Sequence, residues 1–82
     1  MPKFWAQAVR QADKVKRRPL LILKRNLGAV LVVMRRSEVG ALLPKARARM
    51  DVNVGGEWLV VGLWGDVCEV GRIGEYAPRT LQ

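Results

Sequence analysis

The chain has 82 residues, half of them hydrophobic, which leaves room for one small folded domain and excludes a disordered chain. Fifteen Lys and Arg residues against seven Asp and Glu give a formal net charge of +8. Such a field attracts nucleic acids or acidic protein faces, although it can also serve solubility alone. The chain has no histidine and a single cysteine, so a Cys/His zinc site, an intrachain disulfide and histidine general-base catalysis are excluded.

The cysteine and the apolar runs bear on location. Cys68 lies in an apolar stretch, where we expect a small core residue rather than a nucleophile. A chain without disulfides fits a reducing compartment, so we expect a cytoplasmic protein. The longest apolar run, residues 28–34, is too short to cross a bilayer, and the first residues lack the pattern of a signal peptide. We therefore expect no membrane partner.

The first predicted element is an amphipathic helix over Phe4–Arg17, which Pro19 should end. Its apolar side chains recur at helical spacing and form one stripe. These side chains are Phe4, Trp5, Ala8, Val9, Ala12 and Val15. We expect Trp5 to lie in the core.

A β-hairpin follows. The predicted strands are Pro19–Arg25 and Ala29–Arg36, joined by a turn at Asn26-Leu27-Gly28. The first strand is continuously apolar, as in a strand that is covered on both faces. Ser37 is the predicted N-cap of a short helix through Leu43. Three apolar side chains of that helix should face the core: Val39, Leu42 and Leu43.

The second half predicts a three-stranded antiparallel meander. Ala and Arg favour a helix near residues 44–50, yet strict alternation over Lys45–Val54 is typical of a half-buried strand. A turn at Gly55-Gly56, a strand over Glu57–Trp64, a turn at Gly65-Asp66 and a third strand over Val67–Ile73 follow. The expected fold is α+β: an N-terminal helix, a β-hairpin, a short helix and the meander. Whether the strands form one sheet or two stays open.

We expect a single domain over residues 1–82. It divides into a scaffold over 1–43, the meander over 44–73 and a tail over 74–82. Its carboxylates fall where turns, caps or solvated faces would place them, and no phosphate-binding glycine loop is present. No Asp is followed by a Glu-x-Lys triplet. The sequence therefore predicts no catalytic residue, no metal ligand and no cofactor, and hence a non-enzyme.

The basic residues form three clusters that we predict to contact phosphates. One ends the first helix, one lies at the ends of the hairpin, and one lines a face of the strand over Lys45–Val54. On that strand, same-face side chains lie about 6.6 Å apart, close to the spacing of successive phosphates. A solvated outer face is the alternative, and cations at a helix C-terminus also stabilise the macrodipole. The clusters are Lys14, Lys16, Arg17 and Arg18; Lys24, Arg25, Arg35 and Arg36; and Lys45, Arg47 and Arg49. All of these except Lys16 are the predicted contacts.

Trp58 and Trp64 share one parity on their predicted strand, so both should point to one side of the sheet. If that side is exposed, the two rings could stack on bases. Otherwise they belong to the core or to a dimer interface.

Four segments carry a resemblance to a known family. They are Phe4–Ala12 (FWAQAVRQA), Arg18–Asn26 (RPLLILKRN), Val32–Arg36 (VVMRR) and Leu42-Leu43. Over residues 4–43 the chain resembles the C-terminal half of phage-type PD-(D/E)XK endonucleases, the Holliday-junction-resolvase-like group. In that family a helix with a Gln-Ala pair follows the catalytic strand, and a hairpin and a Leu-rich helix come next.

The departure from this family concerns its chemistry. The family's metal-binding Asp and its Glu-x-Lys lie upstream of the Gln-Ala helix and have no counterpart in these residues. Of the residues near its site, only Gln7 and Arg10 have counterparts. The resemblance therefore implies a nuclease scaffold with a DNA-facing surface and without the cutting chemistry. The order of elements is also similar, less closely, to that of the Phd/YefM antitoxins.

Three functions fit these observations. The first is a non-catalytic nucleic-acid-binding protein of phage or prophage type, dimeric, that contacts the phosphate backbone of DNA in preference to RNA. The second is a small phage inhibitor of the anti-CRISPR type that binds an acidic face of a host protein complex. The third is a partial nuclease whose carboxylates come from a partner chain.

Overall fold

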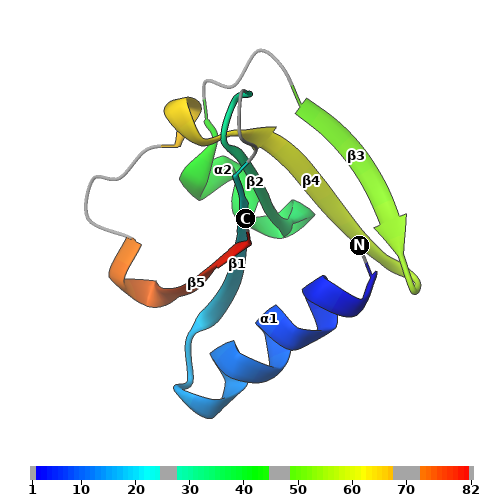
Figure 1. Ribbon diagram of the computed structural model, residues 1–82, viewed down its shortest axis with the longest axis vertical. Helices are drawn as coiled ribbons and strands as arrows, with labels where there is room; N and C mark the ends of the chain where they lie inside the picture. The colour runs from blue at the N-terminus through cyan, green and yellow to red at the C-terminus, as the bar shows by residue number, and fades with distance from the viewer. Residues whose placement is uncertain (1, 25–27, 45–48, 68–72, 82) are drawn as a thin grey trace.

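The protein forms one mixed sheet with a helix on each face (Figure 1). This computed structural model describes residues 2–24, 28–44, 49–67 and 73–81. The helices are α1 (Pro2–Lys14) and α2 (Val39–Leu42). The strands are β1 (Arg18–Leu23), β2 (Leu31–Arg35), β3 (Arg49–Val54), β4 (Glu57–Leu63) and β5 (Tyr76–Leu81). Short 3-10 turns lie at Arg36–Glu38, Trp64–Asp66 and Ile73–Glu75.

The strand order is β3-β4-β2-β1-β5, so the described strands form one continuous sheet. Three of the four pairings are antiparallel, and β5 runs parallel to β1 from Arg18↔Tyr76 to Leu23↔Leu81. Helix α1 packs on one face, mainly over β1 and β5, and α2 packs on the other (Figure 1). This arrangement confirms that β1 is covered on both faces.

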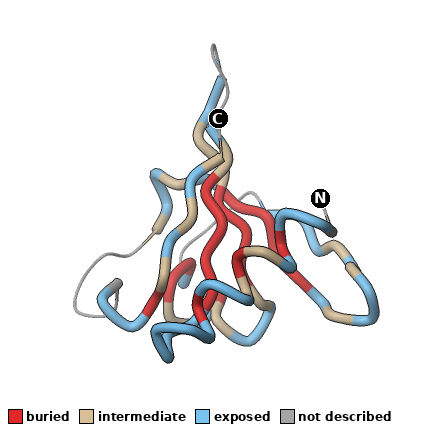
Figure 2. Tube along the Cα trace, turned by 60° about the horizontal axis from the view of Figure 1, so that its bottom comes forward, coloured by how far each residue is buried: buried red, intermediate tan, exposed pale blue. Residues whose placement is uncertain are grey.

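Each sheet face has its own hydrophobic cluster, because the buried central strands carry apolar side chains on both sides. On the α1 face, Trp5 and Ala8 pack on Leu21, Val33 and Leu59. Figure 2 shows the buried residues running along the central strands. The α2 face holds Leu20, Val32, Met34, Val39, Leu42, Leu43, Val60 and Tyr76. The core positions predicted for Trp5 and for the short helix are therefore confirmed.

Helix α1 ends earlier than predicted and for a different reason. The sequence predicted a helix through Arg17 that Pro19 stops, but the helix ends at Lys14. Lys16 adopts a left-handed φ of 56°, and its N–H donates to the carbonyl of Asp13 at 3.2 Å. The N–H of Arg17 donates to the carbonyl of Ala12 at 2.9 Å. These two bonds form a Schellman motif, in which a lysine takes the position that glycine usually fills.

The turns were predicted with mixed success. Gly55 and Gly56 join β3 to β4 with φ of 60° and 87°, which confirms the predicted two-residue hairpin. Ser37 does not cap α2, because it lies inside a 3-10 turn and Glu38 occupies the N-cap position without a side-chain bond. Most of the predicted turn at Asn26-Leu27-Gly28 and the position of Cys68 lie outside the described residues.

The three-stranded meander and the C-terminal tail are wrong. The chain leaves β4 through a 3-10 turn, and no strand lies at Val67 or Ile73, the described ends of the predicted third strand. The predicted tail contains β5 instead. The segment YAPRTL lacks the apolar run of a central strand, but it lies at the sheet edge, where Pro78 is tolerated. The division into 44–73 and 74–82 falls with this correction.

Hydrogen bonds hold β5 on β1 at both ends. At the start of β5, the hydroxyl of buried Tyr76 donates to Oε2 of Glu38, which also accepts from Nη1 of Arg18 at 3.0 Å. At the far end, the N–H of Lys24 donates to the carbonyl of Leu81 at 2.8 Å. Burial and the bond to Glu38 raise the pKa of Tyr76 to about 12. The buried hydroxyl therefore stays protonated as part of the fold.

Candidate nucleic-acid interface

The outer face of α1 carries a stripe of long polar side chains. Lys3, Gln7, Arg10 and Lys14 follow one another at spacings of four, three and four residues, so helical geometry places them on one face. The two lysines and Arg10 are exposed, and Gln7 is half-buried. At a rise of 1.5 Å per residue, the stripe from Lys3 to Lys14 is about 16 Å long.

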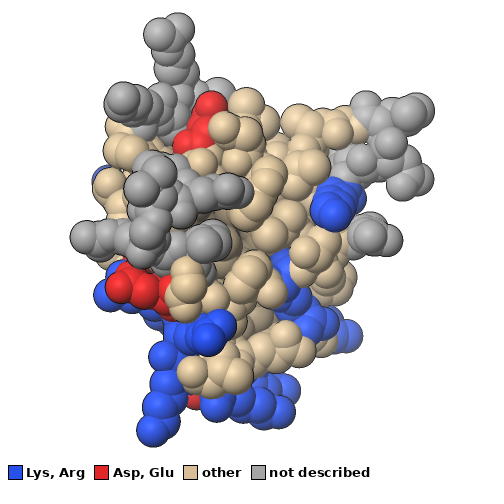
Figure 3. All heavy atoms as spheres, turned by 90° about the vertical axis from the view of Figure 1, so that its left-hand side faces the viewer, with Lys and Arg blue, Asp and Glu red and all other residues tan. Residues whose placement is uncertain are grey.

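The Schellman turn extends this stripe with Lys16 and Arg17, both exposed. We call the five residues the α1 cation surface: Lys3, Arg10, Lys14, Lys16 and Arg17. Within the described parts of the chain, no carboxylate lies within 4.0 Å of a nitrogen of these five side chains. Figure 3 shows Lys and Arg gathered at the lower end of the molecule, where Figure 1 places the end of α1 and the start of β1.

Arg79 reaches this surface from the neighbouring strand. Residue 79 pairs with Leu21 and belongs to the α1 side of the sheet. Its Nη2 donates to Oε1 of Gln7 at 3.1 Å. The Nε of Arg79 is buried, and no partner for it exists among the residues that the structure describes. A sixth cation therefore lies against the stripe.

The cations of β2 and the following turn are in a different state. We call Arg35 and Arg36 the β2 pair. Nε of Arg35 lies 3.0 Å from Oε2 of Glu57, whose Oε1 accepts a bond from Nε1 of Trp5 at 2.7 Å. Nε of Arg36 lies 3.9 Å from Oδ2 of Asp51. Both cations thus have an internal carboxylate partner.

The structure sorts the ten predicted phosphate contacts as follows. Lys14 and Arg17 belong to the α1 cation surface, whereas Arg18 follows it and is paired with Glu38, whose hydrogen bond raises the pKa of Arg18. Arg35 and Arg36 are paired, and Lys24 and Arg49 are exposed. Arg25, Lys45 and Arg47 lie outside the described residues.

The two predicted tryptophans lie on the α2 side of the sheet, as their parity indicated. Trp58 is 50% exposed, and the guanidinium of Arg36 lies 5.9 Å from its ring centre. Trp64 is half-buried and packs against the α2-side cluster. Trp64 is therefore largely a packing residue, while Trp58 presents an open ring face.

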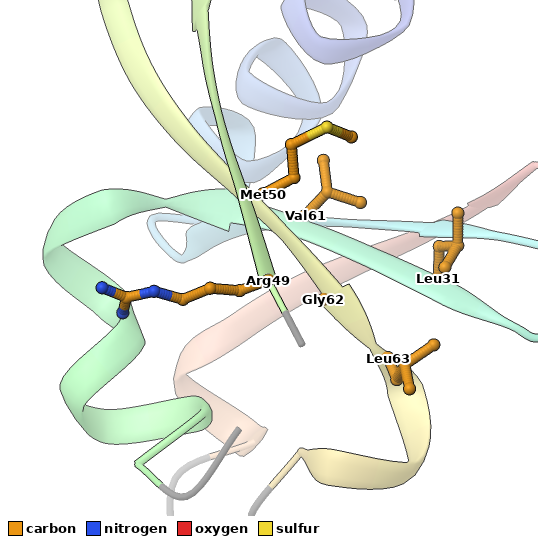
Figure 4. Close-up of a pocket in the computed structure, with 6 residues that line it drawn as sticks. All are labelled: Leu31, Arg49, Met50, Val61, Gly62 and Leu63. Atoms are coloured by element: carbon orange, nitrogen blue, oxygen red, sulfur yellow. The ribbon is translucent and has the colours of Figure 1, made fainter. Parts of the chain in front are cut away.

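A shallow hollow of about 290 Å³ lies at the β3 edge of the sheet (Figure 4). It is lined by Leu31, Arg49, Met50, Val61, Gly62 and Leu63. Figure 4 shows the side chain of Arg49 extending away from those of Met50 and Val61. The hollow is therefore almost wholly apolar and brings no reactive groups together.

Neither a metal-binding cluster nor a membrane-spanning helix occurs in the part of the chain that the structure describes. Within residues 2–24, 28–44, 49–67 and 73–81, no three Cys, Asp or Glu residues come close enough together to hold a metal ion. Among the same residues, neither helix has the length and apolar character required to cross a bilayer.

Comparison with known proteins gives one match. A model of the family described as "phage putative PDDEXK endonuclease" matches residues 1–58, from α1 to the start of β4. The chain belongs to this family. No curated protein and no solved structure matches the chain.

Membership in the nuclease family confirms the resemblance and implies nucleic acid as the substrate class. It also points toward an enzyme, whereas the sequence predicted a non-enzyme. Because the described residues contain no carboxylate cluster, they give no basis for assigning catalytic residues. The family match includes the whole α1 cation surface and excludes Arg79.

Four residues of this region were absent from the predicted set. Lys3 and Arg10 could have been found from their spacing of seven residues, which places them on one helix face with Lys14. Lys16 was placed in the predicted cluster at the end of the first helix but not among the ten predicted contacts. Arg79 gave no signal, because only the pairing of β5 with β1 brings it to α1.

Proposed function

We propose that this domain binds the phosphate backbone of nucleic acid, DNA in the first place, through the α1 cation surface, and that it does not cleave the strand by itself. One observation carries the proposal. Five exposed cations without a carboxylate partner among the described residues lie along one face of a helix and its terminal turn, in a member of a phage nuclease family.

Contacts between these cations and phosphates favour binding that does not depend on the base sequence. Lys and Arg side chains on phosphates release counter-ions, so binding weakens steeply with salt. Five contacts predict a slope of about −4.5 in a plot of log affinity against log salt concentration. Phosphate contacts position the protein and carry no base information, so unrelated duplexes should bind alike.

The test is fluorescence anisotropy with a short labelled duplex, between about 50 and about 200 mM salt. A triple variant, Arg10→Gln with Lys14→Gln and Arg17→Gln, should reduce the salt slope by about three units, since each lost phosphate contact removes about one. The matched control, Lys24→Gln with Arg36→Gln and Arg49→Gln, removes the same charge from exposed cations elsewhere. It should reduce the slope by less than one unit.

Three results would overturn this assignment. Salt-insensitive binding or no binding would remove the function, and an equal loss in both triple variants would remove the site. The absence of cleavage is tested separately, with supercoiled plasmid and Mg²⁺ or Mn²⁺. Nicking by the pure chain would contradict the non-cleaving part and leave the binding surface standing.

A further inference from the structure

The guanidinium of Arg79 is half-buried and has no carboxylate partner among the described residues. It has five N–H groups, and among the described residues one bond, from Nη2 to Oε1 of Gln7, uses one of them. Its Nε is buried without a partner in the same part of the chain. A partly buried charge in this state is costly unless a counter-ion stands near.

The neighbours of Arg79 increase this cost. Lys3 and Arg10 stand four residues before and three residues after Gln7, so their Cβ atoms lie about 5–6 Å from that of Gln7 on the helix surface. Neither has a carboxylate partner within the described residues, and neither has Arg79. Gln7 thus lies on a helix face that carries two further cations, and its amide oxygen accepts a bond from a third, Arg79.

An anion would resolve this arrangement. Arginine binds phosphate through two parallel N–H bonds, and Nη1 and Nη2 of Arg79 retain N–H groups for this purpose. The backbone on both sides is fixed, because Gln7 belongs to α1 and Arg79 to the paired strand β5. Such a fixed site would hold a phosphate in one place, whereas the exposed lysines would attract it without positioning it.

We propose that Arg79 and Gln7, flanked by Lys3 and Arg10, form a binding subsite for one phosphate group. The assignment of that phosphate to a nucleic-acid backbone rests on the proposed function. A free phosphate has the same chemistry, and the experiment below treats the two sources separately.

The first measurement uses inorganic phosphate and the wild-type chain. Nitrogen-15 NMR spectra should show saturable shifts of the Gln7 side-chain amide and of Nε–Hε of Arg79. The Nε–Hε signal of Arg36, which has an internal carboxylate, should not move. Shifts of equal size at both arginines would reveal screening alone and would overturn the subsite.

The second measurement adds a counter-ion inside the protein. Gln7→Glu places a carboxylate beside Arg79, so it should preserve the fold and remove the need for an external anion. It should lower the affinity for the labelled duplex about tenfold, the equivalent of one charge-assisted hydrogen bond. The matched control, Gln11→Glu, adds the same charge at an exposed position of α1 and should lower it about twofold.

The outcomes separate the two proposals. If the duplex binds and both variants lose affinity equally, the subsite fails and the proposed function stands. If the duplex does not bind, the proposed function fails, and the shifts caused by inorganic phosphate still decide the subsite. Arg79→Lys keeps the charge but loses the two parallel N–H donors of the guanidinium, so it should bind the duplex more weakly than the wild type. Unchanged affinity would contradict the two-bond geometry.

Discussion

The α1 cation surface and the β2 pair contain the same kinds of side chain in opposite states. In the β2 pair each guanidinium has a carboxylate, Glu57 for Arg35 and Asp51 for Arg36. Along α1 the cations face solvent, and no such partner lies within reach in the described residues. The first arrangement ties strands together, and the second leaves charge available to another molecule.

The difference teaches that the position of the carboxylates, more than the number of cations, defines a basic interface. Three of the seven acidic residues, Glu38, Asp51 and Glu57, lie against arginines at the ends of β1 and β2. Exposed ion pairs of this kind contribute little to stability, about 0–1 kcal/mol each. Their larger effect here is to compensate three arginines at the ends of β1 and β2, whereas the five cations of α1 and its terminal turn have no carboxylate partner among the described residues.

Arg18 lies between the two regions and is bonded to Glu38, which also accepts a bond from Tyr76. Removing this second bond has the largest predicted effect on stability. Tyr76→Phe removes the hydroxyl that donates to Glu38, the partner of Arg18. Because a buried hydrogen bond to a charged group is lost, the free energy of unfolding should fall by about 2 kcal/mol. Urea unfolding at neutral pH measures this loss of free energy. The slope of the unfolding free energy against urea concentration should stay unchanged.

The same pair of proteins tests the pKa of Tyr76. Folding raises this pKa from 10.0 to about 12, so the folded chain holds the hydroxyl proton more tightly than the unfolded chain. The resulting stability is complete below pH 10 and is lost as the pH rises toward 12. The difference between wild type and Tyr76→Phe should therefore shrink across this window. A constant difference would contradict the raised pKa.

A smaller effect separates charge from backbone strain within the α1 cation surface. Lys16 has a left-handed φ of 56°, which costs a residue with a Cβ about 1 kcal/mol relative to glycine. Lys16→Gly should raise the free energy of unfolding by about that amount, and Lys16→Ala should leave it nearly unchanged. Both variants lose one cation and should show the same reduced duplex affinity. Unequal affinities would mean that Lys16 acts through the turn.

The smallest predicted effect comes from removing the carboxylate partner of Arg36, which leaves this cation unpaired like those of the α1 cation surface. Asp51→Asn removes the partner of Arg36 and should raise the affinity for a duplex about threefold, the scale of one exposed ion pair. Asp66→Asn removes the same charge from an exposed position in the 3-10 turn after β4 and should change affinity less. If the two variants behave alike, pairing of Arg36 is irrelevant and only net charge matters.

The first half of the fold could be predicted because local patterns and tertiary packing agree there. Apolar spacing placed α1, and the continuous run at Leu20–Leu23 indicated a strand covered on both faces, as β1 is. The Gly55-Gly56 turn was specified by residues that accept positive φ. Strand β5 could not be found in this way, because it depends on the edge of β1 and not on its own composition.

The candidate site was predictable in part for a related reason. Neighbours in sequence, such as Lys14 and Arg17, were recognised as a cluster from their spacing alone. The two ion pairs depend on which strands lie side by side, and sequence patterns do not predict that order. The pairs are Arg35 with Glu57 and Arg36 with Asp51. The contact between Gln7 and Arg79 depends on the parallel docking of β5, the element that was missed.

That parallel docking has a consequence for synthesis on the ribosome. The hairpins β1–β2 and β3–β4 pair nearby segments, whereas residues 18–23 must wait for residues 76–81. A chain stalled before Tyr76 would already carry the cations of α1 but would lack Arg79 and therefore the phosphate subsite. Because a ligand stabilises the state that it binds, a polyanion would favour chains that already contain β5 and would hold this strand in place.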